Sequence, residues 1–170
     1  MEYITNKIDR ESLKPGDHIY AYRKLHSYSH HGIFIGGDRV IHYNKTQEGN
    51  TSKRVKQYCK NCGIDENPLR GVVNSCVDCF LKRHTLRRFQ YAVGKGRYLL
   101  SWPGTCTTDP AEQPGVTIRR ANDLFNNKVG FGDYNLFENN CEAFAVFCKT
   151  GNRVSHQAYS AKFWTKPSSS

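Results

Sequence analysis

The chain has 170 residues, 38% of them hydrophobic, which is enough for one domain with its own core. Twenty-five Lys and Arg against fifteen Asp and Glu give a net charge of +10, which attracts anionic partners such as nucleic acid or acidic lipid head groups. No apolar run is as long as a membrane span, and the N-terminus lacks the apolar core of a signal peptide. We therefore expect an intracellular protein, cytoplasmic by default, whose membrane contact is peripheral.

The seven cysteines point to a reducing compartment. Their number is odd, and four of them form two Cys-x-x-Cys pairs. This pattern fits metal binding or catalysis better than a secreted disulfide framework.

The N-terminal third is expected to form three strands. Residues 18–23, 30–35 and 39–43 alternate or are rich in aliphatic and aromatic side chains, and residues 36–38 form a glycine-rich hairpin turn. A turn centred on Gly37 and Asp38 pairs Ile33 with His42, and a bulge at the glycines shifts this pairing by one residue. We expect His30 and His42 to share one sheet face that packs against a helix carrying a cysteine.

A Cys-rich insert is expected within the domain at residues 51–88. Its two Cys-x-x-Cys pairs, separated by thirteen residues, can close a four-sulfur tetrahedral site for structural zinc. The ligands are Cys59, Cys62, Cys76 and Cys79. The alternatives are two disulfides or plain thiols, with residues 72–81 forming a helix with an apolar stripe. The basic charge of the insert also suggests a zinc-ribbon nucleic-acid binder, but no base-reading helix or stacking platform supports it.

The rest of the chain is expected to hold one strand, a long loop and several helices. Alternation predicts a strand at 85–93, Pro and Gly predict a surface loop at 102–115, and periodicity predicts an amphipathic helix at 117–125. A loop at 130–135 leads to the helix that carries Cys141, and 152–163 is a candidate for a last helix.

Cys141 lies in the first turn of the helix that runs to about Thr150. Its spacing from Phe144 and Cys148 places it on the apolar face, and Gly151 follows the helix. Unpaired amides and the helix dipole there favour thiolate, and Asn139 or Asn140 can cap the turn. These are the conditions for a nucleophilic cysteine, although a buried structural cysteine in an apolar helix has the same pattern.

The order of motifs resembles the lecithin:retinol acyltransferase-like proteins. The motifs are Pro15-Gly16-Asp17-His18-Ile19, His30-His31-Gly32-Ile33-Phe34-Ile35-Gly36, Val40-Ile41-His42, Tyr134-Asn135-Leu136 and Asn139-Asn140-Cys141-Glu142-Ala143-Phe144. The resemblance covers residues 13–50 and 116–158, and the His-His-Gly form with a Cys-rich middle is most similar to plant members. It implies a single α+β domain over 1–170 of the circularly permuted NlpC-type, papain-like class, with an antiparallel sheet packed on the helix of the nucleophile.

The resemblance also implies the roles of the site residues. Cys141 is the nucleophile, His30 the general base and His42 the residue that orients His30, while Tyr28 lies near the oxyanion site. His31 is an alternative base if the alignment shifts by one residue. Ala143 stands where the family usually has histidine, outside the triad.

Such a site supports acyl transfer from a phospholipid or another acyl-lipid through a Cys141 thioester. With water as acceptor the reaction is that of a phospholipase A, and with an amine or hydroxyl it is that of an acyltransferase. The alternative is a catalytically silent scaffold or binding subunit of a larger protein assembly.

Overall fold

The computed structural model describes residues 6–24, 28–45, 56–65, 70–127, 131–135 and 139–153. In this part of the chain, one antiparallel sheet of five strands has the order β4-β3-β2-β1-β5. The α+β class is confirmed. The strands are β1 (His18–Arg23), β2 (Tyr28–Gly36), β3 (Arg39–Asn44), β4 (Gly71–Cys76) and β5 (Arg87–Arg88). The helices are the 3-10 turn η1 (Arg10–Ser12), α1 (Val77–Leu81), α2 (Lys95–Leu100), α3 (Pro114–Asn126) and α4 (Cys141–Thr150).

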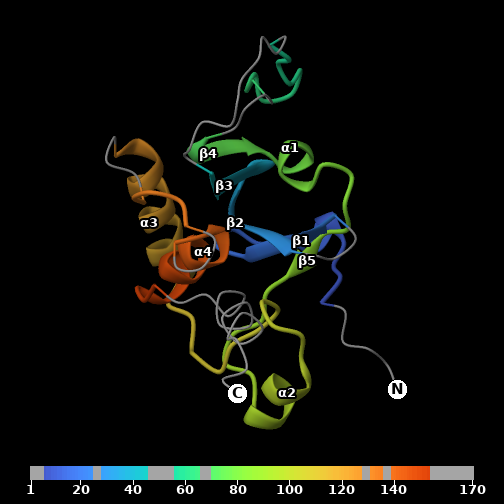
Figure 1. Cartoon of the computed structure of the whole chain (residues 1–170), viewed down its shortest axis with the longest axis vertical. Helices are drawn as coiled ribbons and strands as arrows, with labels where there is room; N and C mark the ends of the chain where they lie inside the picture. Colours follow the sequence, from blue (N-terminus) through green and yellow to red (C-terminus); the bar gives the residue numbers. More distant parts are fainter. Residues whose placement is uncertain are drawn as a thin grey trace, which may run out of the picture.

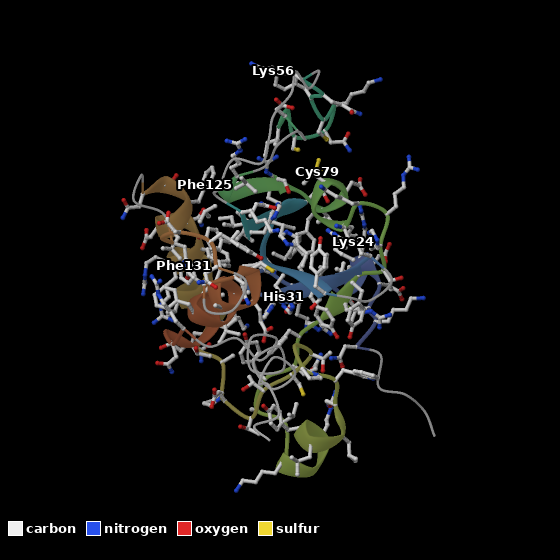
Figure 2. The ribbon with its side chains drawn as sticks, in the orientation of Figure 1. Lys24, His31, Lys56, Cys79, Phe125 and Phe131 are labelled. Atoms are coloured by element: carbon white, nitrogen blue, oxygen red, sulfur yellow. The ribbon has the colours of Figure 1, made fainter. Side chains whose placement is uncertain are left out.

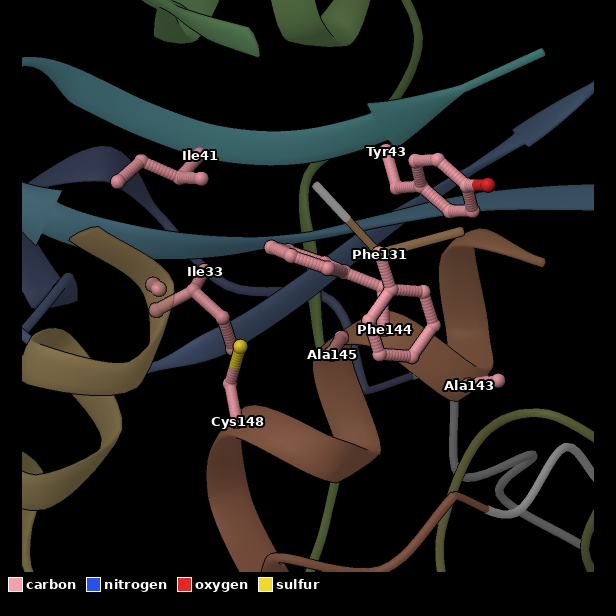
Figure 3. Close-up of a cluster of buried hydrophobic side chains, with 9 residues drawn as sticks. Ile33, Ile41, Tyr43, Phe131, Ala143, Phe144, Ala145 and Cys148 are labelled. Carbon is pink, nitrogen blue, oxygen red and sulfur yellow. The ribbon is translucent and has the colours of Figure 1, made fainter. Parts of the chain in front are cut away.

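Helices cover the two faces of the sheet unequally. In Figure 1, α3 and α4 lie together at one side of the sheet, α1 follows β4 at the top, and α2 projects at the bottom. The α4 face buries alternate residues of β2 and β3 against the helix, as Figure 3 shows for Ile33, Ile41 and Tyr43 around Phe144. The opposite face buries Phe34 and Val40 against Phe80 of α1.

The β2–β3 hairpin has a bulge. Gly36 pairs with Arg39, but the register shifts at Ile35, so that Gly32 pairs with His42 and Ile33 pairs with Ile41. The pairing of Ile33 with His42 expected from an unbulged hairpin is therefore wrong. Because side chains alternate along a strand, the shift places His30 and His42 on the same face.

The helix that carries Cys141 is confirmed. It begins at Cys141, and the Asn140 side chain caps it by accepting a hydrogen bond of 2.9 Å from the amide of Ala143. It ends at Gly151, which has a φ of 80° that favours glycine.

Other expectations need correction. The alternative of a helix over residues 72–81 is wrong for its first half, because β4 pairs with β3 along its length at the edge of the main sheet, whereas residues 77–81 form α1. Only 87–88 of the predicted 85–93 strand pair as a strand. Helix α3 begins at Pro114, within the predicted 102–115 loop, because proline is tolerated in the first turn of a helix. The expected last helix falls largely on residues 154–163, outside the described residues.

Candidate active site

His30 and His42 form a hydrogen-bonded pair. His30 Nε2 lies 2.9 Å from His42 Nδ1, and the two rings meet edge to face with their centroids 5.0 Å apart. Both rings pack on the buried ring of Phe80, with centroid distances of 5.2 and 5.3 Å. The predicted proximity of these two imidazoles is present in the structure.

The hydrogen bonds around His42 have a defined direction. The Ser75 hydroxyl donates to the carbonyl of Cys76 at 3.1 Å, so it accepts from His42 Nε2 at 2.8 Å. His42 Nδ1 is then an acceptor, which agrees with the Asn44 amide donating to it at 3.2 Å. His30 donates through Nε2, and its Nδ1 is left as an acceptor with no hydrogen-bond partner among the described residues.

The Cys141 sulfur meets the backbone of β2 beside His30. Its Sγ lies 3.6 Å from the carbonyl oxygen of Ser29, and the amide of His31 also hydrogen-bonds to it. The ladder to β3 begins only at Gly32, so residues 28–31 of β2 pair with β1 alone. The sulfur therefore reaches an edge of β2 that β3 leaves uncovered.

Helix α4 lies on the other face of the sheet from the two imidazoles. Its apolar residues pack with Ile33, Ile41 and Tyr43, whereas His30 and His42 lie on the α1 side with Phe80. The expectation that the histidine face packs against this helix is thus wrong. The first residue of α4, Cys141, contacts the backbone on either side of His30, at the carbonyl of Ser29 and the amide of His31.

The Cys141 thiol is not converted to thiolate by its position in the helix. Burial raises the pKa of Cys141 to about 11, an effect that exceeds the lowering by the His31 amide and the Tyr134 hydroxyl. The expected preference for thiolate is corrected, because loss of hydration outweighs the dipole of the first turn. A base must remove the proton before this sulfur can act as a nucleophile.

The imidazoles are held neutral. Burial lowers the pKa of His30 well below its usual value, with a further contribution from His42, and lowers the pKa of His42 to about 3. The positive charges of Arg23 and Lys82 act in the same direction. His30 Nδ1 is therefore unprotonated at pH 7, and the lowered pKa makes it a weaker base than a free imidazole.

His31 belongs to a separate network at the centre of the molecule (Figure 2). Its Nδ1 lies 2.7 Å from His18 Nε2, its Nε2 lies 2.8 Å from the Ser29 hydroxyl, and His18 Nδ1 lies 2.8 Å from the hydroxyl of Tyr91. Both ring nitrogens of His31 are therefore engaged by neighbours other than Cys141.

Tyr134 contacts the sulfur, and Tyr28 is near Tyr134. Tyr134 hydrogen-bonds to Cys141 and packs against Tyr43, with ring centroids 5.1 Å apart. Burial raises the pKa of Tyr134, and Tyr28, which begins β2 and is 42% exposed, makes a small contribution in the same direction. From the sequence alone, no role was assigned to Tyr134 or Ser75. The only sequence features that point to them are weak: Tyr134 lies in a family motif, and Ser75 precedes Cys76.

The four cysteines of the two Cys-x-x-Cys pairs converge. Their sulfur atoms all lie within 4.8 Å of one another. The Cys59 and Cys76 sulfurs are 3.8 Å apart and those of Cys62 and Cys79 are 3.6 Å apart. Ligands at about 2.3 Å around a tetrahedral zinc ion are separated by about 3.8 Å. The cluster therefore has the dimensions of a site that can hold a metal ion.

The cluster joins a short loop to the main sheet. Cys76 and Cys79 are buried at the end of β4 and in α1, and Cys59 and Cys62 lie in a turn where the amide of Gly63 donates to the Cys59 carbonyl at 2.8 Å. The amides of Cys62 and Asn61 lower the pKa of Cys59 to about 7, which favours the thiolate that a metal requires. Figure 2 shows Cys79 below the loop that carries Lys56.

No helix among the described residues is long and apolar enough to span a membrane. Comparison with known proteins gives two findings. The sequence model described as lecithin retinol acyltransferase matches residues 11–154. Protein LEAD-SENSITIVE 1 of Arabidopsis thaliana is 43% identical over 164 residues, which cover 88% of this chain and 62% of that protein. The chain thus spans about three fifths of the relative's length. With the family match extending over most of its length, this chain belongs to the lecithin retinol acyltransferase family.

Proposed function

We propose that the chain transfers acyl groups from lipid esters through a thioester on Cys141, with His30 as general base and His42 as the residue that orients it. The observation that carries the proposal is the directed hydrogen-bond chain ending at His30 Nδ1, a neutral acceptor one strand position from the backbone that contacts the Cys141 sulfur. The family's general acyltransferase and phospholipase activity supports it.

The steps follow from the protonation states. His30 Nδ1 accepts the thiol proton while the Cys141 sulfur bonds to the ester carbonyl carbon of the lipid. The carbon–oxygen ester bond then breaks, and the lysolipid oxygen takes the proton from His30. Water, an amine or a hydroxyl next attacks the thioester, giving up its proton through His30 to the departing sulfur. The amides at the start of α4 and the hydroxyl of Tyr28 or Tyr134 would stabilise the oxyanion.

The order of the chain supports a permuted papain-like arrangement. In this sequence the histidine-bearing strands precede the helix of the cysteine, and the second ring nitrogen of the base is bound by a further polar residue. We propose that the sheet and α4 correspond to the NlpC-type core, with His42 as the third member of the triad.

The test is formation of a thioester. The protein is incubated with phosphatidylcholine vesicles that carry a fluorescent acyl chain, and the acyl adduct is detected by mass and by its release with hydroxylamine. We expect the adduct in the wild type and in Cys148→Ala, and its loss in Cys141→Ala and His30→Gln. An adduct that survives in Cys141→Ala would refute this nucleophile. No adduct in any variant would favour the scaffold, and salt-sensitive binding of nucleic acid would favour the third alternative.

We propose peripheral contact with an anionic membrane through α2 and the turn after it. Leu99, Leu100 and Trp102 are 79%, 90% and 75% exposed, and the exposed cations Lys95 and Arg97 precede them without an intervening acidic residue. Apolar and aromatic side chains beside cations are typical of segments that lie in the interface of an anionic bilayer.

Co-sedimentation with vesicles tests this contact. We expect binding to phosphatidylserine-containing vesicles that weakens at least tenfold when Leu99, Leu100 and Trp102 are all changed to Ser. Phe125→Ser is the matched control, because this exposed side chain lies on α3. Equal loss in both variants would refute a role for α2.

We propose that the four-cysteine cluster holds structural zinc. Four soft thiolates with tetrahedral spacing and no position left for water suit this ion. Metal analysis of purified protein should give one equivalent of zinc, which Cys62→Ser should lose. A metal-free protein that folds normally would refute the site.

A further inference from the structure

At two places a residue that contacts the histidine pair is the sequence neighbour of a cysteine of the cluster. Ser75, whose hydroxyl contacts His42, immediately precedes Cys76, and Phe80, whose ring supports both imidazoles, immediately follows Cys79. Two of the four sulfurs are thus one residue away from the groups that set the geometry of His30 and His42.

The link through Cys76 is a hydrogen bond. The Ser75 hydroxyl donates to the carbonyl of Cys76, and this bond makes the hydroxyl an acceptor for His42. The orientation of the Cys76 peptide therefore determines which nitrogen of His42 carries the proton. Through His42 it also determines that His30 presents an unprotonated Nδ1.

Residues 75–83, which carry Ser75 and Phe80, have few stabilising interactions within the segment itself. Helix α1 has five residues, its N-cap Cys76 makes no side-chain cap hydrogen bond, and short helices are marginal in isolation. Lys82 and Arg83, directly after it, have φ values of 47° and 67°, which non-glycine residues rarely adopt. Arg23 supports the far end by donating to the carbonyls of Phe80 and Leu81.

We propose that a divalent metal ion bound by the four cysteines is a positioning element of the acyl-transfer site. By fixing Cys76 and Cys79 it holds Ser75 and Phe80, and these two residues fix the tautomer and orientation of His42 and His30. The inference rests on the catalytic roles proposed above, and it adds a dependence of those roles on the metal. The ion takes no part in the chemical steps.

The experiment compares metal content with the tautomers of His18, His30, His31 and His42. Long-range ¹H–¹⁵N spectra distinguish the Nδ1–H from the Nε2–H form of each imidazole, and Co²⁺ substitution reports tetrahedral thiolate coordination by its absorption. Wild type, Cys62→Ser and Lys60→Ala are compared. Lys60 is an exposed residue between the two loop ligands, so its replacement is the matched control.

We expect the wild type and Lys60→Ala to hold one metal ion and to show His30 and His42 as single Nε2–H tautomers. Cys62→Ser should lose the metal, and signals of His30 and His42 should become mixtures of tautomers. His18 and His31 should stay unchanged, because they lie on the other face of the sheet. Metal loss that leaves His30 and His42 unchanged would overturn the proposal, as would a wild type that binds no metal.

A second variant covers the case in which Cys62→Ser fails to fold. Ser75→Ala keeps all four cysteines, so metal content should stay at one equivalent while the His42 tautomer changes and the rate of thioester formation falls about tenfold. An unchanged tautomer in Ser75→Ala would also overturn the proposal. If the wild type forms no thioester, the proposed function fails, and the tautomer measurements still decide whether metal and histidines are coupled.

Discussion

Lowering the pH from 7 to 5 should strongly destabilise the fold, because three histidines are buried and a fourth, His30, is partly buried, all in the neutral form. Burial lowers the pKa of His31 and of His42 to about 3, and it lowers the pKa of His18 and His30 well below the usual value. Between these folded pKa values and the unfolded value of about 6.5, the unfolded chain binds more protons than the folded chain. Stability therefore falls as the pH falls through this window.

The size of the effect follows from the pKa shifts. With an unfolded pKa of about 6.5 and a folded pKa of about 3, a histidine costs about 2 kcal/mol of unfolding free energy at pH 5. His31 and His42 together account for about 4 kcal/mol, and the lowered pKa values of His18 and His30 act in the same direction. Since small domains are stable by about 5–15 kcal/mol, this is a large share of the total.

Urea unfolding followed by circular dichroism at pH 7.5, 6 and 5 measures this dependence. We expect each buried histidine to contribute a slope of up to about 1.4 kcal/mol per pH unit. His31→Gln should remove one such contribution, whereas His84→Gln, at an exposed position, serves as the control. An unfolding free energy that stays constant between pH 7 and 5 would refute neutral burial of the imidazoles.

Three further predictions concern α4 and Gly32, the residue of β2 that pairs with His42. With its pKa raised to about 11, Cys141 should be alkylated by iodoacetamide at a rate that rises about tenfold per pH unit from pH 8 to 10, and a plateau from pH 7 would indicate a preformed thiolate. Asn140→Ala should lower the unfolding free energy by about 1 kcal/mol in urea titrations by removing the N-cap, and Asn140→Ser should restore most of it. Gly32→Ala should cost about 1–3 kcal/mol, because the added Cβ would lie 2.8 Å from Val40 and 2.9 Å from the ring of Phe80. Unchanged stability of the Gly32 variant would contradict this close packing.

Strands β1 to β3 and helix α4 were predictable because their residues carry local signals. Alternation of aliphatic and aromatic side chains defined β1, and the apolar face with its asparagine cap and Gly151 defined α4. Strand β4 was not predictable in this way. Its Val72, Val73 and Cys76 are compatible with a helical stripe, and only pairing with β3 makes the segment a strand.

The residues of the candidate site were predictable from the sequence, but their protonation states were not. Residue types and motif order identified Cys141, His30 and His42, but their protonation depends on burial, which no local pattern encodes. A cysteine in a first helical turn suggested thiolate, yet complete burial produces a thiol with a raised pKa. The contribution of Ser75 depends on a long-range contact with His42 and had no signal beyond the neighbouring Cys76.

One extra residue in a hairpin decides whether the histidine pair exists. Without the bulge at Ile35, the pairing of Gly36 with Arg39 would continue to Ile33 and His42, and His30 would lie on the opposite face from His42. The bulge shifts the partner of His42 to Gly32, and a glycine is needed there because a Cβ would collide with Val40 and Phe80. The hydrogen bond between the two imidazoles therefore requires both the bulge and the missing side chain at Gly32. Both are therefore conditions for the directed hydrogen-bond chain that ends at His30 Nδ1.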